Sequence, residues 1–308
     1  MQLPFTTLDV FTTTPYIGNP LAVVRVPASL RTTLTEEQKQ KIAREFNLSE
    51  SVFLHDPTPL NNSTADFDIF TPLSRMSFAG HPTIGTAVYV ASNPSSYPGV
   101  NALKTIAGTI PLKYEEDTGR ASVQVPHDFR IHEKRLAHPF SGAETNASAS
   151  ETVPLVSIVK GMAFNLVPMK DLGALGLPTK GLLPVEECYL AEHLDKDSGW
   201  DVGYTGTFYY TDVGEEEGVR NLRTRSIGTR EDPGTGSASC ALCCYLAVVR
   251  RREGGERVQR FHLTQGVEMG RRCDIFITVE TTEDGQGIES VELSGTAVKV
   301  MEGTLTIE

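Results

Sequence analysis

Two stretches of the chain repeat one pattern, HPTIGTA at residues 81–87 and DPGTGSA at residues 232–238. Each has an imidazole or acidic residue, Pro, two further residues, Gly, a hydroxyl residue and Ala, and a run suited to a buried helix follows at residues 88–91 and 239–247. Proline is favoured at the first helical position, and Gly beside Ser or Thr suits the turn before it. The repeat therefore predicts two copies of one loop-and-helix device, about half a chain apart.

The start of each predicted helix is a candidate anion site. The first four N–H groups of a helix have no partner within it, and the helix dipole is positive at this end. If the two helix starts face each other, they converge on one ligand that carries a carboxylate. We therefore expect a small carboxylate-bearing substrate.

Composition and charge favour a small substrate over a polymer. The chain has 308 residues, a hydrophobic content of 39% and a net charge of −11 from 28 basic and 39 acidic residues. This length suits roughly two domains, and the negative charge argues against nucleic acid or an anionic membrane as a partner. The first residues lack the basic and apolar parts of a signal peptide, and no apolar run is long enough to span a membrane. We expect a soluble, cytoplasmic protein.

The five cysteines are expected to be unbridged thiols. An odd number, at Cys188, Cys240, Cys243, Cys244 and Cys273, does not form a disulfide framework in a protein of this size. The three clustered cysteines have apolar neighbours and no second Cys or His pair at a ligand spacing, which argues against a metal site. Cys in such a run behaves as a small buried hydrophobe, so we predict that these residues pack a helix.

The rest of the chain is predicted to be mostly strands. One further helix starts at the capping box TEEQ of residues 35–38 and runs to about Phe46. Residues 132–152, rich in Ala, Ser and Thr without periodicity, are predicted to be a surface insertion or a linker. Alternating or β-branched runs predict strands at residues 5–11, 21–26, 51–54, 66–70, 105–114, 120–125, 156–159, 164–168, 200–210, 221–226, 261–265, 273–279, 290–293, 297–301 and 303–307.

A buried helix among many short strands in each half predicts an α+β fold with two similar lobes. We expect residues 1–128, with the returning strands of residues 294–308, to form the first lobe. Residues 129–293 are expected to form the second. A ligand cleft is expected between the lobes.

Eight short motifs follow one another along the chain: DVF at 9–11, GNPLAVV at 18–24, NLSESVF at 47–53, FTP at 70–72, GHPTIGTA at 80–87, EDPGTGSA at 231–238, QG with GR at 265–271, and GTAV at 295–298. Together they resemble the phenazine-biosynthesis PhzF-like family over essentially the whole chain. The resemblance implies the diaminopimelate epimerase-like fold, in which each lobe is a strand barrel around a central helix, and it implies a homodimer. This fold agrees with the internal repeat.

The resemblance also implies a carboxylate where some relatives have thiols. Relatives that epimerise diaminopimelate use two cysteines, and at the matching positions this chain has Ala79 and Pro233. Cysteine-based racemisation is therefore not expected. The PhzF-like pattern supplies Glu50 as the catalytic carboxylate instead.

The position of Glu50 leaves two interpretations. It follows a predicted helix and precedes the strand at residues 51–54, so its side chain either reaches the cleft or points into water. In the cleft, a partly desolvated carboxylate is suited to take a proton from carbon and return it elsewhere.

Substrate-binding positions carried over from the resemblance are His81, Asp232, Ser237, Gly80, Gly236 and, as a weaker candidate that is also a turn former, Asn19. His81 and Asp232 occupy equivalent positions of the repeat. They either cap their helices or orient the polar groups of the substrate from the two lobes. The Ser237 hydroxyl and the neighbouring amides are expected to hold the substrate carboxylate.

The predicted function is a cofactor-independent isomerase that moves a proton within a small carboxylate-bearing metabolite, with Glu50 as the proton carrier. The GTG of residues 234–236 lacks the third glycine of a dinucleotide fingerprint, and no Gly-Lys-Ser/Thr phosphate loop occurs, so no cofactor is expected. The best-known member of the family isomerises a dihydro-hydroxyanthranilate, but a fold does not determine a substrate. The alternatives are a glutamate-based epimerase or racemase, and a ligand-binding or regulatory protein without turnover.

Overall fold

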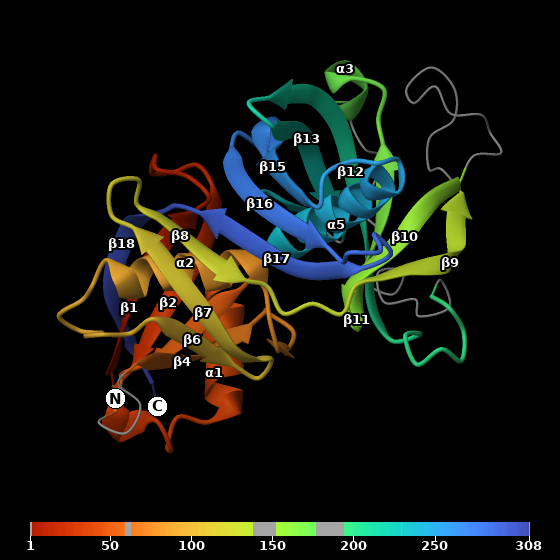
Figure 1. The fold of residues 1–308 in the computed structure, drawn as a ribbon. Coiled ribbons are helices and arrows are strands. Elements are labelled where there is room, and N and C mark those ends of the chain that lie inside the picture. Colours follow the sequence, from red (N-terminus) through yellow and green to blue (C-terminus); the bar gives the residue numbers. More distant parts are fainter. Residues whose placement is uncertain (1, 59–62, 138–151, 177–193, 229, 308) are drawn as a thin grey trace. The chain divides into compact units, whose positions relative to one another are not determined.

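Among the described residues, strands make up most of the regular secondary structure, and few helices accompany them (Figure 1). The computed structural model describes residues 2–58, 63–137, 152–176, 194–228 and 230–307. The chain divides into two compact units, unit 1 with Met1–Pro126 and Leu293–Glu308 and unit 2 with His127–Glu292. The mixture of many strands with a few helices confirms the predicted fold class. Among the described residues, no helix is both long and apolar enough to cross a membrane.

Unit 1 is a series of paired strands in which the first and last strands of the chain are neighbours. The bounds are β1 (Gln2–Val10), β2 (Asn19–Val26), β3 (Ser51–His55), β4 (Thr64–Phe70), β5 (Arg75–Met76), β6 (Ala102–Thr105), β7 (Gly108–Glu115), β8 (Arg120–Gln124) and β18 (Ala297–Thr306). β1 pairs antiparallel with β2 and β18, β2 runs parallel to β3, and β3 pairs antiparallel with β4. β4 pairs with the short β5 and, in parallel, with β6, and β7 and β8 follow as antiparallel neighbours.

Unit 2 has the same kinds of pairing. The bounds are β9 (Arg130–Ala137), β10 (Thr152–Val159), β11 (Gly161–Pro168), β12 (Gly203–Glu216), β13 (Val219–Ile227), β14 (Glu231–Asp232), β15 (Val258–Gln265) and β16 (Cys273–Thr281), while β17 (Ile288–Gly295) leads back to unit 1. β10 pairs antiparallel with β9 and β11, β11 runs parallel to β12, and β12 pairs antiparallel with β13. β13 pairs with the short β14 and, in parallel, with β15, which is antiparallel to β16.

The internal repeat is visible in this order of pairings. In each unit a hairpin leads to a parallel neighbour and then to an antiparallel pair. A two-residue strand turns back on that pair, at β5 and at β14, and the central helix follows, α2 (Gly80–Ala91) in unit 1 and α5 (Gly236–Arg252) in unit 2. The chain then returns to a strand parallel to the one before the turn. The predicted device is therefore present in both units.

Both central helices are buried among strands of their own unit. α2 contacts β1, β2, β3, β7, β8 and β18, and α5 contacts β10, β11, β15 and β16 (Figure 1). A Cβ on Gly85 of α2 would lie 2.5 Å from Leu21 Cδ2 and 2.8 Å from Val10 Cγ2, so only a glycine lets the helix approach β1 and β2 this closely. This packing holds the start of α2 in a set place.

The clustered cysteines pack α5, as predicted. Cys240, Cys243 and Cys244 are fully buried, and burial raises the pKa of all three thiols. They therefore stay protonated and apolar in character. Cys188 lies outside the described residues.

The peripheral helix α1 (Glu36–Phe46) starts at the predicted capping box. Thr35 Oγ1 accepts a hydrogen bond from the Gln38 N–H (3.2 Å), and Gln38 Oε1 accepts one from the Thr35 N–H (3.0 Å). Ile42 and Phe46 of this helix pack against the core of unit 1. The other helical segments in the described part of the chain are short: η1 (Ala28–Leu30), α3 (Leu172–Leu175) and η3 (Val267–Met269).

Three predicted segments differ from the structure. Residues 297–301 and 303–307, predicted as two strands, form the single strand β18. Residues 132–137, predicted as the start of an insertion, belong to β9. The buried position of this segment is occupied by His132, whose Nε2 lies 2.7 Å from Ser157 Oγ. Because this residue is polar, the segment lacks the alternating aliphatic residues by which a strand is recognised in a sequence. Residues 138–151 lie outside the described residues. Residues 105–114, predicted as one strand, are two, because the chain turns between β6 and β7 at Gly108 (φ 118°).

Candidate active site

Glu50 lies in the short turn between α1 and β3, at the start of the strand. α1 ends at Asn47, whose left-handed backbone (φ 51°) turns the chain out of the helix. β3 begins directly after Glu50, where Ser51 lies opposite Ala22 of the parallel strand β2. The Glu50 side chain is 18% exposed, so it does not point into open water.

His81 and Glu50 lie side by side in unit 1. Gly80 is the first residue of α2 and His81 the second, with the first helical hydrogen bond from the Thr83 N–H to the Ala79 carbonyl (3.2 Å). The His81 side chain is buried, and its Nδ1 lies 3.6 Å from Glu50 Oε2. Both the imidazole and the positive end of the helix dipole stabilise a negative charge at this place.

Asn19 belongs to the same unit. It is the first residue of β2, lies opposite Val10 of β1 and is buried. It is therefore part of a regular strand pair and not only of a turn. A further turn, at residues 11–18, is held by the buried carboxylate of Asp9, which accepts a hydrogen bond from the Tyr16 N–H (2.6 Å).

Asp232 lies in unit 2, on the short strand β14 that precedes α5. Its Oδ2 accepts a hydrogen bond from the Thr235 hydroxyl (2.5 Å). The strand itself is held by Glu231, whose carboxylate makes a two-pronged ion pair with the buried Arg225 at 2.8 and 3.0 Å. Asp232 therefore has a defined backbone position and a defined carboxylate contact.

A buried glutamine holds the segment between Asp232 and α5. Gln265 Nε2 donates hydrogen bonds to the Asp232 carbonyl (2.7 Å) and to Thr235 Oγ1 (3.0 Å), while its Oε1 accepts one from the Thr235 N–H (3.1 Å). The next residue, Gly266, has φ 75°, and a Cβ on it would lie 2.7 Å from the Pro233 carbonyl oxygen. Thr235 and Gln265 were not among the predicted site residues. The available signal was a glutamine at a buried position of a strand, in register with Phe261 and Leu263.

Gly236 and Ser237 are the first two residues of α5. The first helical hydrogen bond runs from the Ser239 N–H to the Thr235 carbonyl (3.0 Å), and Thr235 makes no side-chain cap. Ala79 makes none at α2 either. The interpretation of His81 and Asp232 as helix caps is therefore wrong, because the N-cap positions are Ala79 and Thr235.

His81 and Asp232 are also not equivalent in the repeat. Three residues separate the short strand from the helix in both units, 77–79 in unit 1 and 233–235 in unit 2. In this register His81 corresponds to Ser237, and Asp232 corresponds to Met76. The two prolines mislead the sequence comparison: Pro82 lies inside the first turn of α2, where an N–H is not needed, whereas Pro233 lies before α5.

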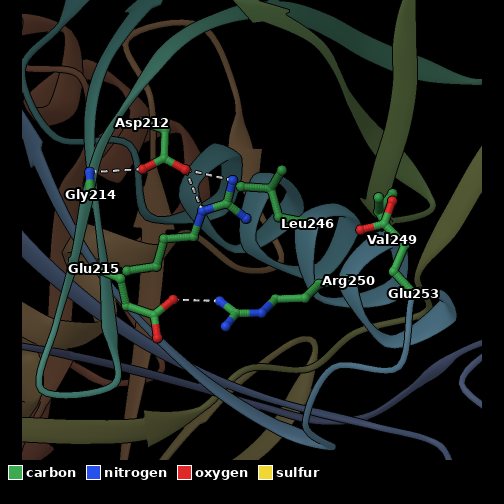
Figure 2. Close-up of a pocket in the computed structure, with 8 residues that line it drawn as sticks. Asp212, Gly214, Glu215, Leu246, Val249, Arg250 and Glu253 are labelled. Atoms are coloured by element: carbon green, nitrogen blue, oxygen red, sulfur yellow. Dashed lines mark hydrogen bonds and ion pairs between the residues drawn. The ribbon is translucent and has the colours of Figure 1, made fainter.

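A surface hollow on unit 2 lies away from these residues. It has a volume of about 420 Å³ and is lined by Asp212, Gly214, Glu215, Arg220, Leu246, Val249, Arg250 and Glu253 (Figure 2). Asp212 pairs with Arg220 and Glu215 with Arg250, each at 2.6 Å (Figure 2). The first pair lies within the β12–β13 hairpin, and the second joins this hairpin to the last turns of α5. The hollow contains none of the predicted site residues. Among the described residues, no three His, Cys, Asp or Glu side chains are grouped to hold a metal ion.

Comparison with known proteins shows which family the chain belongs to. The model of the phenazine biosynthesis-like protein family matches residues 8–303. The trans-2,3-dihydro-3-hydroxyanthranilate isomerase of Pseudomonas aeruginosa is 29% identical over 97% of this chain and 98% of its own length. A PhzF-family protein of Bacillus anthracis has the same fold, with a TM-score of 0.75, 22% identity and complete coverage of both chains. A hydroxyproline epimerase of Agrobacterium vitis has a TM-score of 0.62 and 14% identity over 99% of this chain and 92% of its own. The chain thus belongs to the phenazine biosynthesis-like family and is an isomerase of the PhzF type.

Proposed function

We propose that this isomerase moves a proton between carbon atoms of a small carboxylate-bearing molecule and that Glu50 carries the proton. The supporting observation is the pair formed by Glu50 Oε2 and His81 Nδ1, 3.6 Å apart at the first turn of α2. A partly buried carboxylate next to an imidazole can accept a proton from carbon and deliver it to a second carbon of the same molecule. The reaction is an isomerisation, which conserves atoms and electrons, so it requires no net oxidant or reductant.

The other candidates are assigned to substrate binding. His81, which lies beside Glu50, is assigned to orienting the substrate through a hydrogen bond to one of its polar groups. Asp232, held in place by Thr235, orients a second polar group of the substrate. In unit 1, Gly80 at the start of α2 is also assigned to substrate binding. In unit 2, the Ser237 hydroxyl and the Gly236 amide, at the start of α5, are assigned to binding a carboxylate.

The substrate is proposed to resemble trans-2,3-dihydro-3-hydroxyanthranilate, the compound named for the Pseudomonas aeruginosa relative. The test is incubation of the protein with this compound in D₂O, with ¹H NMR and mass spectrometry of the product. A panel of small carboxylic acids is incubated in parallel. Deuterium uptake together with a moved double bond supports the proposal.

Two outcomes favour the alternatives. Exchange with inversion at one carbon and no change of constitution indicates an epimerase or racemase. Saturable binding without exchange of any compound indicates a ligand-binding protein. In the first case a Glu50→Gln variant shows whether the observed exchange depends on this carboxylate.

A further inference from the structure

We infer that Gln265 is a positioning residue for the reaction, because it directs the Thr235 hydroxyl toward the carboxylate of Asp232. This inference rests on the proposed role of Asp232 in substrate binding. Gln265 is the last residue of β15 and is fully buried, so it does not touch solvent itself. It acts through two residues of the segment that leads into α5.

The orientation of the Gln265 amide is determined by its partners. The Thr235 N–H can only donate, so it faces the amide oxygen at 3.1 Å. The Asp232 carbonyl can only accept, so it faces the amide nitrogen at 2.7 Å. The second amide hydrogen then points to Thr235 Oγ1, 3.0 Å away. If the amide were turned over, its nitrogen would face the Thr235 N–H, donor against donor. Its oxygen would face the Asp232 carbonyl, acceptor against acceptor.

This arrangement dictates the direction of the Thr235 hydroxyl. Because Thr235 Oγ1 already accepts a hydrogen from Gln265, its own hydrogen is available for Asp232 Oδ2, at 2.5 Å. Hydrogen bonds in such a chain polarise and strengthen one another. One oxygen of Asp232 is therefore held, and the carboxylate has a set orientation relative to its backbone.

The same arrangement affects the start of α5. Thr at an N-cap position ordinarily accepts a hydrogen bond from the second or third amide of the helix. Thr235 makes no such bond, because its hydroxyl is engaged with Asp232 and Gln265. The amides of the first turn, at Gly236 and Ser237, thus remain without a side-chain cap and can bind the substrate carboxylate.

A second buried glutamine on the same strand offers a matched control. Gln259 lies on the same face of β15, and its Nε2 donates to the carbonyls of Ala247 (3.0 Å) and Glu256 (3.1 Å). These contacts hold the last turns of α5, at the opposite end of the helix from Asp232. Substitution of Gln259 therefore tests the effect of losing a buried amide without touching the proposed site.

The experiment compares Gln265→Met with Gln259→Met, since Met has a similar length and fills the same space. Both variants are expected to lower the unfolding temperature. With trans-2,3-dihydro-3-hydroxyanthranilate as the probe, Gln265→Met is expected to lower kcat/KM by about 10-fold, mainly through KM, whereas Gln259→Met stays within about 2-fold. Thr235→Val should reproduce the Gln265 effect, and Thr235→Ser, which keeps the hydroxyl, should restore most of the activity.

A double-mutant cycle separates positioning from a general loss of stability. If Gln265 acts through Asp232, then Gln265→Met changes kcat/KM by less than about 2-fold when Asp232→Ala, which removes the acceptor of the Thr235 hydroxyl, is already present. Independent, multiplicative losses would overturn the inference. An unchanged kcat/KM for Gln265→Met alone would do the same.

A further measurement does not depend on turnover. Amide hydrogen exchange at Thr235 should accelerate in Gln265→Met and stay unchanged in Gln259→Met, because only the first variant removes its acceptor. If Asp232→Asn leaves turnover and binding unaffected, the proposed role of Asp232 in substrate binding is wrong. In that case, slow exchange of the Thr235 amide in wild type would still confirm its hydrogen bond to Gln265. Equal exchange in wild type and Gln265→Met overturns the inference itself.

Discussion

The helices α2 and α5 begin at equivalent places in the two units, yet different groups surround their first turns. At α2 the charged group comes from elsewhere in the chain, since Glu50 precedes β3, and it meets His81 of the helix itself. At α5 the charged group, Asp232, comes from the strand directly before the helix and is held by Thr235. We expect different roles for the two helix starts: the proposed proton carrier lies at α2, and the proposed binding group lies at α5.

The peripheral helix α1 shows what both central helices lack. Its first turn is closed by the reciprocal bonds of Thr35 and Gln38, whereas Ala79 and Thr235 make no side-chain cap. An uncapped helix start is costly unless other groups meet its amides. We therefore expect ligand groups to meet the first amides of α2 and of α5, whereas the first turn of α1 is closed by its own side chains.

The largest effect is expected at Glu50. Glu50→Gln keeps the size of the side chain but cannot carry a proton, so kcat should fall by about two to four orders of magnitude, the usual worth of acid–base catalysis, while ligand affinity changes little. Steady-state kinetics and a binding assay on the same preparation measure the two quantities. Retention of more than about a tenth of the wild-type kcat would remove Glu50 from its role.

A smaller effect of a different kind is expected at Asp232. Asp232→Asn retains an acceptor for the Thr235 hydroxyl but loses the charge, so kcat/KM should fall by about one to two orders of magnitude, with KM rising and kcat falling. His81→Ala should behave in the same way, and Ser237→Ala should raise mainly KM. If Asp232→Asn instead lowered kcat alone, the assignment of proton carrier and binding group would have to be exchanged.

Substitution of one glycine in each unit compares the packing of the two helix starts through the free energy of unfolding. Gly266→Ala places a Cβ against the backbone oxygens of Arg271 and Pro233 at a positive φ, and we expect a loss of about 3 kcal/mol in the free energy of unfolding together with reduced activity. Gly85→Ala meets the ends of Leu21 and Val10 side chains, so the loss should be about 1 kcal/mol. Gly270→Ala, with φ 67° and no heavy atom within 4 Å of the added Cβ, is the control for backbone strain alone.

The smallest effect on activity is expected for the cysteines of α5. Replacement of Cys240, Cys243 and Cys244 by Ala should cost about 1 kcal/mol of stability for each and leave kcat and KM unchanged. Ser at the same positions should cost more, because its hydroxyl is desolvated in an apolar setting. Loss of activity in a well-folded Ala variant, or zinc bound in stoichiometric amount, would show that a thiol acts in the reaction.

Much of the architecture was predictable, because the signals are local. The repeated loop-and-helix motif, the capping box at Thr35 and the alternating strands depend on neighbours in sequence. The adjacency of Glu50 and His81 followed from the family motifs. The role of Gln265 did not, because it depends on β15 lying next to the segment before α5, thirty residues away. The mistaken equivalence of His81 and Asp232 arose because a proline is tolerated both before a helix and in its first turn.

The buried cysteines of α5 bear on how this enzyme responds to its chemical surroundings. Peroxides and alkylating agents attack thiolates, and a raised pKa with complete burial keeps Cys240, Cys243 and Cys244 in the unreactive protonated form. Neither Ala79 nor Pro233, which precede the two central helices, carries a sulfur that could be oxidised. With Glu50 as the proposed proton carrier, we expect the enzyme to keep its activity under conditions that oxidise catalytic thiols.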